Sequence, residues 1–275
     1  QDAAQTGQIA HAAQAAQAPG RACPLHYRYR PEVFAAQAPA TLSGLDVLYV
    51  VGGLYGNTSA LDRVLELFER ESGRKHLIFN GDFHWFDADP AEFERVQRLV
   101  LAHTALRGNV ETELAADPGS GDADAGCGCA YPDWVGDGVV ERSNRILARL
   151  RRAADPAQRA ALADLPMWLR ADVGDVRLGL VHGDAQSLAG WGFAQEHLRD
   201  AAHRDLVRDW LHRAHVDAFA CTHTCLPVYQ GLRARVGGRR QWVLNNGATG
   251  MPNFAGDSAG LLTRIAVTPC DAHLR

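Results

Sequence analysis

The sequence has few cysteines, no large excess of either charge and no signal for membrane insertion, and each absence excludes a class of protein. Six cysteines among 275 residues are too few for a disulfide scaffold, so we expect a reducing, cytoplasmic setting. A formal net charge of -4 provides no basic field to hold nucleic acid. Residues 1–20 are rich in Ala and Gln and contain neither the basic nor the apolar region of a signal peptide. Neither nucleic acid nor a membrane is therefore the expected partner.

The glycine-rich stretch GGLYGN at 52–57 lacks both of the glycine patterns that bind nucleotides. It contains neither Gly-x-Gly-x-x-Gly nor the Gly-Lys-Ser/Thr of a P-loop, which disfavours a nucleotide-dependent dehydrogenase and a P-loop enzyme. It does join an apolar run to a helical pattern, and α/β proteins place phosphate chemistry at such junctions. The loop holds no acid, His or Lys, so its role has to be found elsewhere in the sequence.

The composition and the order of patterns indicate one α/β domain. With 47% hydrophobic and 22% charged residues, the chain can bury a sizeable core. From Leu45 onward, short apolar runs alternate with helical periodicity, which is typical of βαβ units and a mostly parallel or mixed sheet. We predict an Ala/Gln-rich arm at 1–22 and a single domain at 23–275. Six glycines within 115–138 predict an inserted loop there.

The predicted strands and helices alternate along the domain. Apolar runs predict strands at 45–51, 76–80, 104–109, 176–183, 217–224, 240–247 and 260–268. Helical spacing of apolar residues predicts helices at 58–73, 90–103, 139–153, 156–165 and 196–214.

Four polar residues each follow an apolar run, namely Asp82, Asn109, His182 and His223. Ligands bind beyond the ends of strands in open α/β sheets, so these side chains are expected to converge. Four nitrogen and oxygen ligands suit one divalent transition metal such as Mn, Zn or Fe. Taken singly, Asp82 and Asn109 also fit turn formers, and the histidines fit satisfied core residues. Their joint placement favours a metal site.

Five short motifs occur in order, at 53–55, 81–82, 108–111, 182 and 222–225. Their order and strand context resemble the calcineurin-like metallophosphoesterase family, whose motifs are Asp-x-His, Gly-Asp, Gly-Asn-His-Asp/Glu, a lone His and Gly-His-x-His. The resemblance covers residues 45–268. It implies an α/β (α+β) fold, a four-layer αββα sandwich of two mixed β-sheets, and metal-dependent hydrolysis of a small phosphorylated substrate at the strand ends.

The resemblance also implies two metal sites, of which this sequence keeps one. The first would be held by positions 53, 55, 82 and 225, where the chain has Gly53, Tyr55 and Cys225 and retains only Asp82. The second would be held by positions 82, 109, 182 and 223, and all four ligands are present. We therefore predict one divalent metal on this second set, with Asn109 and His223 also helping to position the ester.

A proton donor for the leaving group is missing from its usual place, because Val110 stands where the family usually has a histidine. His84 is the first candidate, since an extended backbone would point it to the same side as Asp82. It fits equally well an aromatic cluster with Trp85 and Phe86. Tyr55 is an accessory candidate that could donate a hydrogen bond into the first metal position, or a ring that simply fills it.

Three cysteines raise a further possibility. Cys127 and Cys129 lie on the inserted loop, and Cys225 replaces a metal-site histidine. The three thiols are candidate accessory ligands for Zn or Fe, or a redox pair, while the alternatives are a compact lid turn and a small buried hydrophobic residue. Two functions stay open, a metal-dependent phosphoesterase acting on a phosphate mono- or diester, and a weak or inactive metal-bound relative that binds a phosphorylated ligand or a protein partner.

Overall fold

The computed structural model describes residues 19–36, 41–116, 125–234 and 238–268. Most of the predicted N-terminal arm and the centre of the predicted inserted loop lie outside the described residues. Within the described part of the chain, no helix is both long enough and apolar enough to span a membrane.

The first β-sheet has four strands in the order β10-β2-β3-β4. Strands β2 (Val47–Val51), β3 (Lys75–Asn80) and β4 (Thr104–Leu106) are parallel, and β10 (Thr263–Ala266) pairs antiparallel with β2. All four occur where apolar runs predicted strands. Strand β4 is shorter than predicted because the chain turns after Leu106 and enters helix α4 (Asn109–Ala115).

The second sheet has six strands in the order β1-β5-β6-β7-β9-β8. They are β1 (Leu42–Leu45), β5 (Trp168–Val173), β6 (Val176–Val181), β7 (Ala218–Cys221), β8 (Pro227–Arg233) and β9 (Arg240–Asn246). Sequence patterns predicted β6, β7 and β9 but missed the other three. In the edge strand β8, Gln230 and Gly231 interrupt the apolar residues, and buried and exposed positions do not alternate regularly. The period-two pattern that predicts a strand is therefore absent.

The alternation of side chains along β2 explains why the two sheets stack. Leu48 and Val50 lie in the apolar core between the sheets, together with residues of β5, β6 and β7. Val47, Tyr49 and Val51 point to the opposite face and pack against helices. A strand that is apolar on both faces has to be covered on both, which yields a layered fold.

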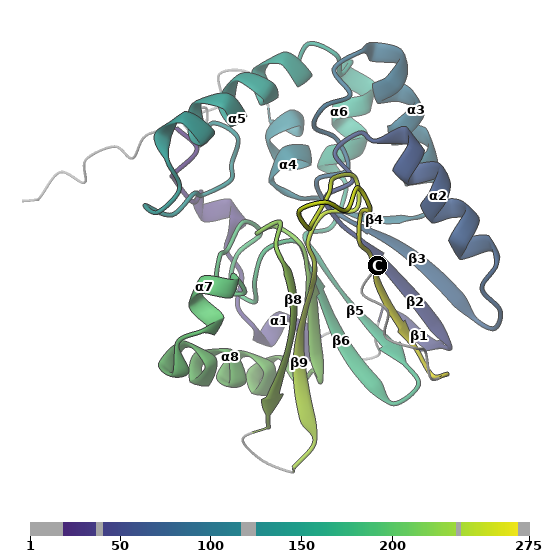
Figure 1. The fold of residues 1–275 in the computed structure, drawn as a ribbon, viewed down its shortest axis with the longest axis vertical. Helices are drawn as coiled ribbons and strands as arrows, with labels where there is room; N and C mark the ends of the chain where they lie inside the picture. Colours follow the sequence, from purple (N-terminus) through teal and green to yellow (C-terminus); the bar gives the residue numbers. More distant parts are fainter. Residues whose placement is uncertain (1–18, 37–40, 117–124, 235–237, 269–275) are drawn as a thin grey trace, which may run out of the picture.

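Helices cover the two outer faces of the sheets (Figure 1). The four-stranded sheet is covered by α2 (Thr58–Glu69), α3 (Pro90–Leu101), α4, α5 (Asp137–Leu150) and α6 (Pro156–Ala163). The six-stranded sheet is covered by α1 (Glu32–Ala36) and α8 (Ala201–Ala214). The predicted αββα sandwich of two mixed sheets is therefore confirmed. One predicted helix, 196–214, is divided into α7 (Gln195–Leu198) and α8, because Asp200 caps a new helix.

The carboxyl ends of the parallel strands from both sheets meet at one edge of the sandwich. Asn80, the last residue of β3, donates from its side-chain amide to the carbonyl of Val181 at the end of β6, at 2.7 Å. The backbone N–H groups of Thr222 and His223 both donate to the carbonyl of His182. The segments that follow β3, β6 and β7 are thereby fixed beside one another.

Candidate metal centre

The four residues predicted as metal ligands lie together in the structure. His182 Nε2 is 3.1 Å from His223 Nδ1, 3.2 Å from Asn109 Oδ1 and 3.3 Å from Asp82 Oδ2. Ligands bound tetrahedrally at the usual metal–nitrogen and metal–oxygen bond lengths are about 3.3 Å apart. The three distances from His182 Nε2 match this spacing, and ligand atoms of Asp82, His182 and His223 all lie within 4.8 Å of one another.

Hydrogen bonds on the far sides of these ligands leave their lone pairs directed at the common centre. His182 Nδ1 is 2.9 Å from the carbonyl oxygen of Asn80, and His223 Nε2 is 3.0 Å from that of Cys129. A carbonyl only accepts, so each of these nitrogens is the donor, and in the neutral imidazole the other ring nitrogen carries the lone pair. Asn109 Nδ2 donates to the Cys127 carbonyl at 2.8 Å, which turns its oxygen inward. Such backing partners are characteristic of metal ligands.

The electrostatics of the centre favour a positive charge. Burial lowers the pKa of His182, but the Asp82 carboxylate outweighs it and the pKa is raised overall. Burial and the neighbouring His182 lower the pKa of His223 to about 4. Burial works to raise the pKa of Asp82, yet His182 and His223 bring it below its ordinary value. One carboxylate and two imidazole lone pairs in a buried space therefore stabilise a cation, and a divalent metal fits this donor set.

The backbone is strained at this edge of the sandwich. Asp82 has a φ of +51°, Tyr55 of +56° and Cys225 of +58°, which are unusual values for residues with a Cβ. At Gly81, with a φ of +79°, a Cβ would come within 2.5 Å of the Gly108 nitrogen. Strain of this kind persists where the surrounding contacts enforce it, and it is concentrated at functional sites.

Glu111 provides the contacts that enforce the strained turn at Asp82. Its buried carboxylate accepts hydrogen bonds from the backbone N–H groups of Asp82 at 2.8 Å, Phe83 at 3.0 Å and His84 at 3.3 Å, and of Gly108 at 2.8 Å. Burial and the Asp82 carboxylate raise its pKa, against the effect of these N–H donors. Glu111 lies in the Gly-Asn motif at 108–111, but nothing in that motif indicates which backbone groups its side chain binds.

Tyr55 and Cys225 lie against each other beside Asp82. The Tyr55 hydroxyl is 2.8 Å from Cys225 Sγ. A Cβ at Gly53 would lie 3.1 Å from the Tyr55 ring, so that ring occupies the space into which a side chain at position 53 would extend. Burial, Cys225 and Asp82 raise the pKa of Tyr55 well above its usual value, so the phenol keeps its proton.

The loop that carries Cys127 and Cys129 reaches the centre mainly through its backbone. The two carbonyls accept from Asn109 and His223, as described above, while the Cys129 thiol is 3.4 Å from Asn109 Nδ2. Burial and Cys127 raise the pKa of Cys129 well above its usual value, which keeps the thiol protonated. The loop thus positions two predicted ligands, and the thiol of Cys129 contacts one of them.

His84 is held in a different environment from the four ligands. Its Nδ1 is 2.5 Å from the Asp87 carboxylate, and its ring stacks on Phe93 with 3.7 Å between ring centroids. Both His84 and Phe93 are fully buried. Residues 82 and 84 were expected to point to the same side because an extended backbone was assumed. The backbone is not extended at Asp82, where φ is +51°, so this assumption does not hold. Among the described residues, no hydrogen bond joins the His84 ring to any predicted ligand.

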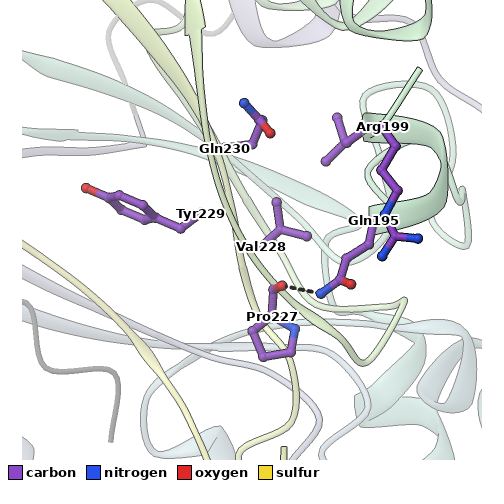
Figure 2. A pocket seen from close by; sticks show the side chains of 7 residues that line it. Gln195, Arg199, Pro227, Val228, Tyr229 and Gln230 are labelled. Carbon is purple, nitrogen blue, oxygen red and sulfur yellow. Dashed lines mark hydrogen bonds between the residues drawn. The ribbon is translucent and has the colours of Figure 1, made fainter. Parts of the chain in front are cut away.

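A surface pocket lies between α7 and β8 (Figure 2). Gln195 and Arg199 line it from one side, and Pro227 and Gln230 from the other. Gln195 donates to the Pro227 carbonyl at 2.7 Å. None of the four predicted ligands lines this pocket, so it is separate from the metal centre.

Comparisons with known proteins find similarity in structure only. No family model and no curated protein matches the chain. The hypothetical protein PH1004 from Pyrococcus horikoshii OT3 matches over 80% of this chain and 87% of its own, with 18% identity and a TM-score of 0.56. A metallophosphoesterase from Sphaerobacter thermophilus matches over 80% and 83%, with 16% identity and a TM-score of 0.49. The chain thus shares its fold with PH1004.

Proposed function

We propose that this chain, which has a metallophosphoesterase-like fold, is a hydrolase of phosphate mono- or diesters that works with one divalent transition metal. The observation that carries the proposal is the convergence of four donor atoms from Asp82, Asn109, His182 and His223. Backing partners fix the donor atoms of Asn109, His182 and His223. A metal bound there would polarise a phosphoryl oxygen and lower the pKa of water toward neutrality. Mn, Zn and Fe all suit this donor set.

The chain's own groups would position the ester and manage its protons. The Asn109 and His223 side chains are held rigidly by the 127–129 loop, so a phosphate beside them meets a preorganised surface. The Tyr55 hydroxyl keeps its proton and lies beside Asp82, so it is the better placed donor for a departing alkoxide. His84 remains a second candidate, although its ring is stacked on Phe93.

A binding protein that lacks hydrolysis is the second candidate function. Two observations favour it, namely the apolar Val110 in place of the family's histidine and the Tyr55 ring in the first metal position. Without a second metal, only one of the attacking and leaving oxygens is stabilised by a cation. Such a protein would hold a phosphorylated ligand or a partner at the same centre.

The first test concerns the number of metals. We expect purified, metal-saturated protein to contain about one transition metal per chain, because the first set offers only a phenol, a thiol and the shared Asp82. Elemental analysis measures this ratio. The triple variant Gly53→Asp, Tyr55→His, Cys225→His, which restores the family's residues, should raise it toward two. A bridged metal pair around Asp82 in the wild type, seen by anomalous diffraction, would contradict the single-metal proposal.

The second test identifies the proton donor. We expect Tyr55→Phe to lower kcat about 100-fold for alkyl esters, whose leaving groups need a proton, with metal content unchanged. For p-nitrophenyl esters, whose leaving group needs none, the loss should be much smaller. His84→Phe, which keeps an aromatic ring against Phe93, is the matched comparison. If His84→Phe shows this leaving-group dependence and Tyr55→Phe does not, the assignment is reversed.

A further inference from the structure

Four rings form a branched cluster beside a predicted metal ligand, and one of them, Trp134, is exposed. We call them the aromatic rim, namely Tyr131, Trp134, Trp191 and His197. Trp191 lies 5.5 Å from the His223 ring, measured between centroids. Tyr131 and Trp134 lie 6.0 Å and 6.2 Å from Trp191, and His197 lies 5.2 Å from Trp134. Each step is within the range of favourable aromatic contact.

The inner part of the rim is fixed to the metal centre. Trp191 Nε1 donates at 3.0 Å to the Cys129 carbonyl, which also accepts from His223 Nε2. The Tyr131 hydroxyl is 2.9 Å from the Ser143 hydroxyl. One carbonyl therefore positions both a metal ligand and the first ring of the rim.

Arg21, near the start of the described residues, holds the outer part of the aromatic rim. The Arg21 guanidinium donates to the carbonyls of Pro132 at 3.0 Å and Val135 at 2.8 Å, on either side of Trp134. It also pairs with Asp137 at the start of α5. These bonds hold the loop in place, so the position of the Trp134 indole does not depend on its own burial.

Trp134 is nevertheless 51% exposed. This open indole lies on a loop that four hydrogen bonds from Arg21 fix. It presents an aromatic surface to solvent, one ring away from the predicted ligand His223. The Trp134 and Trp191 rings are nearly perpendicular, at 86°, so they form a corner and do not cover each other face to face.

We propose that the aromatic rim binds a planar aromatic group of the substrate, a nucleobase or an aryl ring, while its phosphate lies at Asp82, Asn109, His182 and His223. This inference rests on the proposed function, because it assigns the substituent of the same ester. Stacking accepts any planar ring, since every such ring has a π-face, whereas an alkyl substituent gains little from it.

The kinetic test uses diesters that share one leaving group. Methyl, phenyl and thymidine 5′ p-nitrophenyl phosphates all release p-nitrophenolate, so differences in rate report on the other substituent. We expect kcat/KM of the metal-loaded protein to be about tenfold higher for the phenyl and thymidine esters than for the methyl ester. The phenyl and thymidine arms distinguish a general aryl site from a nucleobase site.

Variants locate the preference on the rim. Trp134→Ala should reduce the aromatic-to-methyl ratio to about one, while Trp134→Phe should keep most of the ratio. Tyr229→Ala is the matched control, because Tyr229 is 72% exposed and extends from β8 away from α7 (Figure 2). A ratio near one in the wild type, or a ratio that survives Trp134→Ala, overturns the proposal.

A binding measurement separates this inference from the hydrolysis itself. AMP and ribose 5-phosphate share a phosphorylated ribose and differ in the base, and calorimetry on metal-loaded protein compares them without turnover. We expect AMP to bind about tenfold more tightly, and Trp134→Ala to remove the difference. If no ester is hydrolysed but this difference is found, the proposed hydrolysis fails and the aromatic site stands. Equal affinities for the two ligands overturn the aromatic site, whatever the rate of hydrolysis.

Discussion

Replacing His223 or Asp82 by alanine is expected to remove both metal and hydrolysis. Loss of a mere backing partner weakens metal binding about 10- to 100-fold, so loss of a ligand should weaken it further. The effect should be severe for Asp82, the one carboxylate among the four ligands, because without it no negative charge balances the cation. Elemental analysis and ester hydrolysis on the same samples measure both quantities.

Controls for these variants have to separate lost ligands from lost folding. His223 is buried, so His223→Gln, which keeps much of the volume, accompanies His223→Ala. His212→Ala removes an exposed imidazole from the last turn of α8 and should change neither metal content nor rate. Thermal unfolding of the metal-free proteins shows which variants keep the fold. If wild type and folded His223→Ala protein hydrolyse mono- and diesters at the same background rate, the enzyme proposal is falsified for those substrates.

Glu111→Gln is expected to have the largest effect on stability for its size. The glutamate accepts four buried backbone N–H groups, whereas glutamine offers one oxygen and turns an N–H₂ group toward the remaining donors. Each buried donor that loses its acceptor costs about 1–3 kcal/mol, so roughly 2–5 kcal/mol of unfolding free energy should be lost. For a chain of this length each kcal/mol corresponds to about 2–4 °C in Tm.

Metal affinity should fall together with stability in this variant. Glu111 fixes the turn that keeps Asp82 at a φ of +51°, and a freed turn would relax toward commoner conformations. We expect about 10- to 100-fold weaker binding of Zn or Mn by calorimetry on folded protein. Glu66→Gln is the control, since Glu66 forms exposed ion pairs on α2 that contribute little. Unchanged Tm and metal affinity in Glu111→Gln would show that the turn needs no such support.

The sequence alone determined most of the strands and helices and singled out the four residues predicted as metal ligands. Buried strands such as β2 and amphipathic helices such as α2 and α3 carry periodic signals that follow from the geometry of one element. Asp82, Asn109, His182 and His223 were found because each directly follows an apolar run, and parallel strands that end together bring such residues together.

Only the tertiary structure decided what surrounds those residues. Glu111 binds the turn at Asp82, and the 127–129 loop binds Asn109 and His223 through its carbonyls. His84 contacts Asp87 and Phe93. These contacts join segments that are distant in sequence or that lie across a strained turn. Every residue has a backbone carbonyl, so the sequence does not indicate which carbonyl will accept a given hydrogen bond. A periodic pattern fixes the face on which a side chain lies, and packing alone fixes its partner.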